Sequence, residues 1–203
     1  MGFVRKRAFS ALSVASLGML AASNAHAEYI GYVYQDGTNV VASGSGSLNT
    51  SSLTFTVQTA GATTSVYTSI GFQTFGDVYH GINVYGGFTG PTSFGTGGPK
   101  QADSYTGFGT DILAANNEIV VALGYVSGEQ IAGTAAFDNT TLSALGFNNG
   151  TSTWTWGRGD GADSMVIEVG TAPPASVPEP ASLALLGAGF AGLGLLRRRR
   201  KTA

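Results

Sequence analysis

The histidine and cysteine content limits the chemistry that this chain could perform. The 203 residues contain no cysteine and two histidines, His26 and His80. Zinc and copper sites need clusters of such ligands, so no site of this kind is expected. A Ser-His-Asp triad around His80 is formally available, but the chain has no G-x-S-x-G elbow. We interpret His80 as a surface or half-buried residue beside Tyr79.

Carboxylates are the next candidates, because a pair of them can hydrolyse glycosides. Asp and Glu total 12 residues, and their order along the chain selects no particular pair. We therefore expect no catalytic residue, no enzyme activity and no cofactor. A carbohydrate-active hydrolase that uses an Asp/Glu pair stays the alternative.

A Gly-rich acidic loop spans residues 157–163 and includes Asp160 and Asp163. Such a loop offers oxygen ligands of the kind that calcium prefers. It lacks the period of an EF-hand loop or of a nonapeptide repeat. We interpret the two residues as turn formers and weak calcium candidates, which leaves a calcium-dependent adhesin as a further alternative.

Trp154 and Trp156 alternate with threonines in residues 151–156, which predicts a strand with both indoles on one face. On an exposed face they would form a platform for stacking on sugar rings. On an inward face they would be core anchors that bury a large apolar area. The sequence favours the core.

Charge is distributed unevenly along the chain. Of the ten Lys and Arg residues, only Lys100 and Arg158 lie between residues 28 and 174, where most acids are found. Phosphate contacts require cations, so this acidic middle segment is not expected to bind nucleic acid.

Residues 1–27 have the organisation of a secretory signal peptide. A basic segment, Arg5 to Arg7, precedes an apolar segment from Ala8 to Ala22. Ala25 and Ala27 then form an A-x-A cleavage site, so signal peptidase would leave a mature chain that begins at Glu28 after export by the Sec machinery. An uncleaved N-terminal anchor is the alternative.

The C-terminal end has three parts. A motif of Val177, Pro178, Glu179 and Pro180 precedes an apolar segment at residues 181–196, and a basic stop follows at residues 197–201. The apolar segment would form a helix of roughly 24 Å, against about 30 Å of bilayer core. The positive-inside rule keeps the basic stop cytoplasmic. A buried core helix is the alternative. The arginines of the stop are Arg197, Arg198, Arg199 and Arg200.

These three parts resemble, in order and spacing, the PEP-CTERM sorting signal of exported Gram-negative proteins, which is also catalogued as an ice-binding-protein C-terminal domain. The resemblance covers residues 177–203. It implies cleavage near the Pro-Glu-Pro motif by an exosortase. It also implies a transient stay in the inner membrane, then the cell surface, outer membrane or extracellular (biofilm) matrix, with exopolysaccharide as a partner.

Residues 124–164 resemble a recurring ectodomain that precedes such tails and has no assigned activity. The role expected by analogy is therefore that of a non-enzymatic surface or matrix protein, with glycan binding as the leading activity.

The middle segment, residues 28–170, is expected to form an all-β ectodomain, and residues 171–176 a Pro/Ala linker. Residues 138–146 indicate a cap, one short helical turn and a glycine stop. We expect an antiparallel β-sandwich, jelly-roll-like, of roughly eight to ten strands.

Residues 44–47 and 86–109 are expected to be loops, the second pinned by Phe88, Phe94, Tyr105 and Phe108. The expected strands are residues 29–34, 40–42, 53–57 (half-buried), 65–72, 77–85, 119–126 (buried on both faces), 131–137, 151–156 and 164–169.

Overall fold

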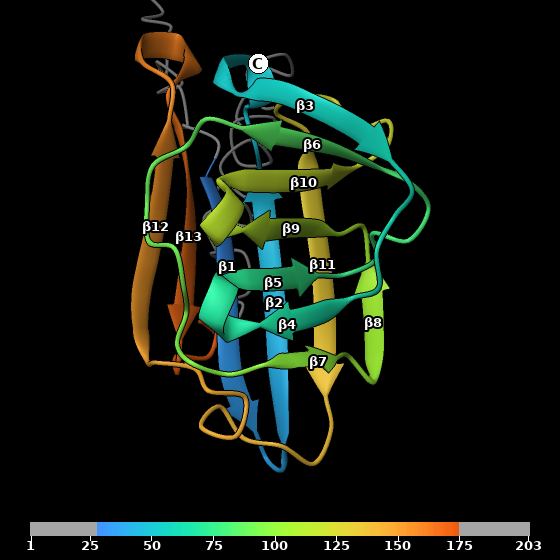
Figure 1. The fold of residues 1–203 in the computed structure, drawn as a ribbon, viewed down its shortest axis with the longest axis vertical. Helices are drawn as coiled ribbons and strands as arrows, with labels where there is room; N and C mark the ends of the chain where they lie inside the picture. The colour runs from blue at the N-terminus through green and yellow to red at the C-terminus, as the bar shows by residue number, and fades with distance from the viewer. Residues whose placement is uncertain (1–27, 175–203) are drawn as a thin grey trace, which may run out of the picture.

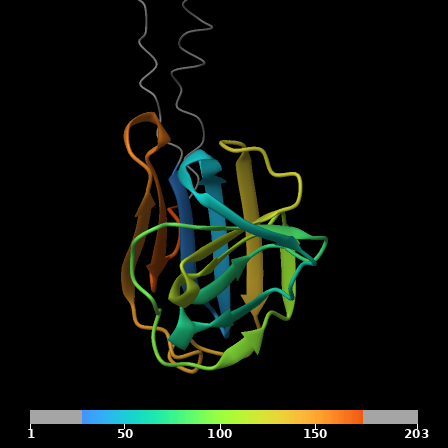
Figure 2. The same cartoon turned by 45° about the horizontal axis from the view of Figure 1, so that its top comes forward.

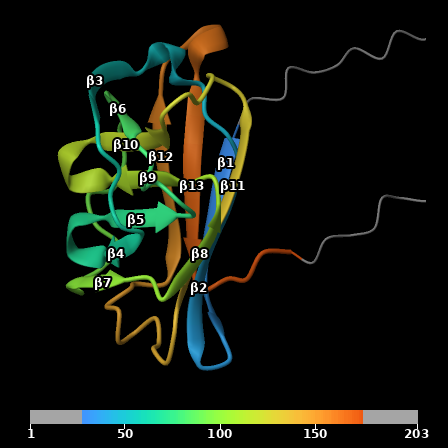
Figure 3. The same ribbon diagram turned by 90° about the vertical axis from the view of Figure 1, so that its right-hand side faces the viewer.

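The computed structural model describes residues 28–174. These residues form two stacked β-sheets, seen from the front in Figure 1 and edge-on in Figure 3. The all-β sandwich expected from the sequence is confirmed. The predicted signal peptide at residues 1–27, the last two residues of the predicted linker (175–176) and the sorting signal at residues 177–203 lie outside the described range.

The six-stranded sheet has the order β12-β13-β1-β2-β11-β8, and the seven-stranded sheet has the order β3-β6-β10-β9-β5-β4-β7. The strands of the first sheet are β1 (Glu28–Asp36), β2 (Asn39–Ser47), β8 (Ser104–Gly107), β11 (Gln130–Phe137), β12 (Gly150–Trp156) and β13 (Asp163–Val169). Those of the second are β3 (Thr54–Thr59), β4 (Ser65–Tyr67), β5 (Phe72–Phe75), β6 (Ile82–Gly86), β7 (Pro99–Gln101), β9 (Thr110–Leu113) and β10 (Glu118–Ala122).

Two features of this topology correct the expected fold. Thirteen strands are present between residues 28 and 169, where eight to ten were expected. The pairing is antiparallel throughout the named ladders except between β1 and β13, which run parallel. An eight-stranded antiparallel jelly roll therefore does not describe the arrangement.

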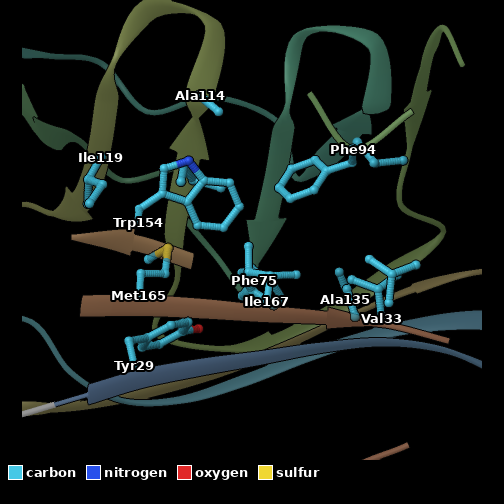
Figure 4. Packing of buried hydrophobic residues seen from close by; sticks show 14 of the residues in the cluster. Tyr29, Val33, Phe75, Phe94, Ala114, Ile119, Ala135, Trp154, Met165 and Ile167 are labelled. Atoms are coloured by element: carbon cyan, nitrogen blue, oxygen red, sulfur yellow. The ribbon is translucent and has the colours of Figure 1, made fainter. Parts of the chain in front are cut away.

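The core lies between the two sheets, and the strands that face it show the alternation that the sequence predicts. In β13, every second residue is buried, from Asp163 to Val169. Trp154 packs edge-on against Phe94, with 5.5 Å between the ring centroids, and Tyr29 packs against Phe75 at 5.8 Å (Figure 4). These rings fill the space between the sheets.

A row of glycines crosses the inner face of the six-stranded sheet. Gly31 pairs with Gly44, Gly44 with Gly133, and Gly133 with Gly107, so the row spans β1, β2, β11 and β8. Glycine has no side chain, so this row is a shallow groove across the sheet. Residues 44–47, expected to be a loop because of their glycines, are part of β2 and contribute to this groove.

Strand β5 of the seven-stranded sheet and the Tyr29 ring lie against the glycine groove. A Cβ atom on Gly44 would collide with the Tyr29 ring, and one on Gly31 would lie 2.5 Å from Cζ of Phe75. A Cβ atom on Gly133 would lie 2.6 Å from the carbonyl oxygen of Phe75. The close approach of β5 to the opposite sheet therefore depends on glycine at these positions.

The long segment at residues 86–109 is only partly a loop, because it contains β7 and β8. Phe88 and Phe94 are buried and anchor it, as expected. Tyr105 and Phe108 are exposed by 42% and 74%, so the prediction that they pin the segment to the sheet was wrong.

Strand β3 also differs from its prediction. Its alternating sequence predicted a half-buried strand, but all six of its side chains are exposed. The strand lies at the edge of the seven-stranded sheet, pairs there only with β6, and is irregular between Phe55 and Val57. By contrast, β10 is buried on both faces, as expected, because Val120 packs against a second cluster on the outer face.

Short helical turns are more numerous than expected. Four 3-10 helices are present in the described range: η1 (Thr50–Ser52), η2 (Thr68–Ile70), η3 (Ala114–Asn116) and η4 (Gly159–Gly161). The turn expected at residues 138–146 is a single i,i+4 turn, closed by Leu145 N–H to Thr141 and stopped by Gly146 at a φ of 71°. No helix among residues 28–174 is long and apolar enough to span a bilayer.

Candidate functional site

A cleft of about 400 Å³ opens at one edge of the sandwich, where the turn after β10 meets the start of β11. The large apolar and aromatic side chains of its lining are Phe108, Leu123, Tyr125 and Ile131. Leu123 and Phe108 are among the most exposed large apolar side chains of the described domain. A concave surface with exposed apolar side chains and a few polar groups is typical of a ligand site.

The backbone on both sides of Phe108 is held firmly. Gly107 of β8 lies opposite Gly133 of β11 in the sheet register, and its carbonyl oxygen accepts a hydrogen bond of 3.0 Å from the Asp77 N–H. Gly109 donates one of 2.8 Å to the carbonyl of Asp77. A Cβ atom on Gly109 would lie 2.6 Å from that same carbonyl oxygen. Two glycines pressed against neighbouring backbone therefore hold Phe108 out into solvent.

Tyr125 is a second lining residue that is held in place, here through its side chain. Its hydroxyl accepts a hydrogen bond of 2.8 Å from the N–H of Leu48 and lies 2.9 Å from the carbonyl oxygen of Glu129. Burial raises the pKa of the Tyr125 hydroxyl, so it stays protonated at neutral pH. The turn before it contains Gly124 at a φ of 90°, the positive region that the third position of a type II turn requires.

Glu129 is the only ionisable carboxylate that lines the cleft, and no Lys or Arg lines it. A glycosidase needs two carboxyl groups flanking the scissile bond. The cleft therefore does not offer the pair that the hydrolase alternative requires.

The tryptophans of β12 are core residues. Trp154 is 0% exposed and Trp156 is 4% exposed. Their indole N–H groups donate hydrogen bonds of 2.8 Å to the carbonyl oxygens of Pro91 and Asn49. The core interpretation is correct, and a stacking platform at these residues is ruled out because no sugar ring can reach a buried indole.

The 157–163 loop, which holds both calcium candidates, lies at the same end of the sandwich as η1 (Figure 2). The carboxylate of Asp163 accepts hydrogen bonds from the backbone N–H groups of Asn49 and Ser164. Asp160 is exposed, and its carbonyl oxygen accepts from the Asn49 side chain at 3.3 Å. No group of three or more acidic, His or Cys side chains suited to a metal occurs within residues 28–174. The Asp163 carboxylate thus ties the 157–163 loop to the start of η1.

His80 lies 3.7 Å from the carboxylate of Asp77, and its side chain is 86% exposed. Tyr79 packs edge-on against it, with 5.8 Å between the ring centroids. The surface interpretation of His80 is confirmed. Asp77 also accepts a 2.8 Å hydrogen bond from the Tyr79 N–H, so its carboxylate caps this turn.

The sequence analysis missed the cleft itself. Phe108 was read as an anchor because aromatic residues in a Gly-rich segment are usually buried. The available signal was its position between Gly107 and Gly109, a spacing that permits close backbone contact on both sides. Leu123 was assigned to a buried strand that in fact ends at Ala122.

The predicted signals at the two ends are not all within the described range. Glu28, the expected first residue of the mature chain, is also the first residue of β1. Ala25, Ala27, the motif at residues 177–180 and the stop at residues 197–200 lie outside it. These assignments stay predictions from the sequence.

A comparison with protein families found a match to the PEP-CTERM protein-sorting motif at residues 176–200. This match confirms the resemblance inferred for the C-terminal segment: residues 176–200 carry a PEP-CTERM sorting motif. The motif marks an exported protein that is processed at the membrane, with an exosortase as the processing partner. A search of curated proteins and a search of solved structures each found no match.

Proposed function

We propose that this chain is a non-enzymatic protein of the cell surface or extracellular matrix, delivered there by exosortase processing and associated with exopolysaccharide. The observation that carries the proposal is the sorting motif at residues 176–200, which begins seven positions after the last strand ends at Val169. A separate folded domain joined to a sorting tail by a short linker is an arrangement suited to release or display of that domain.

The composition of the ectodomain is compatible with export. It has no cysteine to be oxidised, and its two cations, Lys100 and Arg158, leave it acidic. Export by the Sec machinery and cleavage after Ala27 would release Glu28 as the mature N-terminus. That cleavage would leave β1 complete.

The absence of an enzyme activity is part of the proposal. The described cleft has one carboxylate, Glu129, and His80 stands exposed beside Asp77 rather than within the cleft. Binding without catalysis is the function that these side chains support best.

Substitution in the motif tests the sorting claim. A variant with Pro178→Ala, Glu179→Ala and Pro180→Ala should keep its C-terminal tail and accumulate in the inner membrane, because the exosortase would no longer recognise it. The matched control, Pro173→Ala with Pro174→Ala in the linker, should be processed normally. Immunoblots of membrane, surface and medium fractions measure both. Equal processing of the two variants would contradict the proposal.

A further inference from the structure

We infer that the cleft beside Phe108 is a subsite for a pyranose unit of a neutral glycan. The inference rests on the proposed function, since it names the part of the ectodomain that would hold the polysaccharide. It assigns the stacking role, which the sequence left as the less favoured alternative for Trp154 and Trp156, to a different aromatic residue.

An aromatic ring held in solvent is the first argument. Phe108 is 74% exposed, and its backbone is fixed by contacts of Gly107 and Gly109 with β11 and Asp77. Exposing a phenylalanine costs hydrophobic free energy, and the backbone contacts on both sides of Phe108 keep it at this exposed position. The C–H face of a pyranose stacks on such a ring and removes both surfaces from water.

The polar groups of the cleft are the second argument. Glu129 and Gln130 are exposed at its lining and offer a carboxylate and an amide as hydrogen-bond partners for sugar hydroxyls. The other lining side chains include Leu123, Ile131 and the Tyr125 ring, which is already hydrogen-bonded through its hydroxyl. The apolar side chains can contact the C–H face of a sugar ring, and the polar groups can hydrogen-bond to its hydroxyls.

The volume and the charge of the cleft limit the class of ligand that it could hold. The cleft volume of about 400 Å³ lies at the small end of ligand pockets, which suits one or two sugar units of a longer chain. Glu129 is the only ionisable carboxylate in the lining, and no cation lies there to pair with an acidic sugar. An anionic polymer would meet repulsion, so the glycan that fits is neutral.

The test is a calorimetric titration of the full chain, kept in a detergent without a sugar headgroup, with cellohexaose, isomaltohexaose and chitohexaose. We expect saturable binding of at least one of them. Phe108→Ala should weaken that binding at least tenfold, and Phe108→Tyr should retain it. Phe55→Ala is the matched control, because Phe55 is 55% exposed on β3, away from the cleft, and its loss should leave the affinity unchanged.

A charge variant adds a second readout. Glu129→Gln should keep the hydrogen bonds but remove the repulsion, so binding of an oligoglucuronate should rise relative to the unmodified chain.

Circular dichroism verifies that each variant is folded. The inference is overturned if Phe108→Ala binds as well as Phe55→Ala. No saturable binding of any hexasaccharide, or a response only to an uncharged apolar peptide, overturns it as well.

The same variant separates this inference from the proposed function. If Phe108→Ala chains still co-fractionate with extracellular polysaccharide from the native cells, the cleft is not the subsite, but the polysaccharide association stands. If the unmodified chain does not co-fractionate with it, the polysaccharide part of the proposed function fails independently of the cleft.

Discussion

Asp111 lies on β9 with a carboxyl group that is 1% exposed. In the sheet register it stands between Thr74 of β5 and Val120 of β10. The Thr74 side chain hydrogen-bonds to it, while Oδ1 has no partner among the residues that the structure describes. Burial raises the pKa of Asp111 to about 7, because the interior disfavours the charged form.

This raised pKa predicts that the contribution of Asp111 to the stability of the folded protein is smaller at neutral than at acidic pH. The unfolded chain releases the Asp111 proton near pH 4, and the folded protein holds it until about pH 7. The contribution of this group is therefore fully present below pH 4 and is lost as the pH rises to 7, by up to about 4 kcal/mol.

Asp111→Asn should remove this pH dependence, since an amide carries no charge at any of these pH values. Urea unfolding midpoints at pH 5 and pH 8 measure it. Asp36→Asn, at the exposed end of β1, is the control and should keep the original slope. An Asp111→Asn variant that loses as much stability between the two pH values as the unmodified chain would rule out this role.

Single residues also show where sequence reasoning reaches its limit. Trp154 and Trp156 were placed in the core because threonines alternate with them, and this local pattern survives in β12. The exposure of Phe108 could not be predicted from the residues next to it in the sequence. It depends on contacts of its neighbouring glycines with Asp77 and β11, which are far away in the sequence.

At the scale of the element, the glycine row is the feature that positions the two sheets. A methyl group on Gly133 would lie 2.6 Å from a backbone carbonyl oxygen of Phe75, closer than van der Waals contact allows. Backbone cannot move aside as a side chain can, so the sheets would have to separate locally.

Gly133→Ala should therefore lower the free energy of unfolding by roughly 1–3 kcal/mol. Gly98→Ala is the matched control, because no atom lies within 4 Å of the position its Cβ would take. Thermal unfolding followed by circular dichroism compares the two. Equal melting temperatures for both variants would show that the glycine groove does not set the distance between the sheets.

The strands that the sequence predicted best are those whose alternation is set by the core. Strands β11, β12 and β13 match their expected ranges closely. Strand β3 has a similar alternation, but it lies at a sheet edge with both faces exposed. Whether a strand is central or at an edge depends on its pairing with distant segments. The alternation of apolar and polar residues within one segment does not predict that pairing.

At the scale of the whole molecule, the fold and the sorting signal occupy separate parts of the chain. The strands run from Glu28 to Val169, and the sorting motif begins at residue 176. The sequence was sufficient to recognise the three-part tail, because such a signal is defined by residue types in a fixed order. The sequence did not predict the parallel pairing of β1 with β13, which joins the two ends of the domain.

The most direct test of the central claim is the intact mass of the protein recovered from native cell-surface and medium fractions. Export and exosortase processing predict a chain that begins at Glu28 and ends near Pro178 to Pro180, with or without an added group. A recovered chain that still carries residues 197–203 would mean that the tail is a permanent anchor, and the claim of exosortase processing would be contradicted.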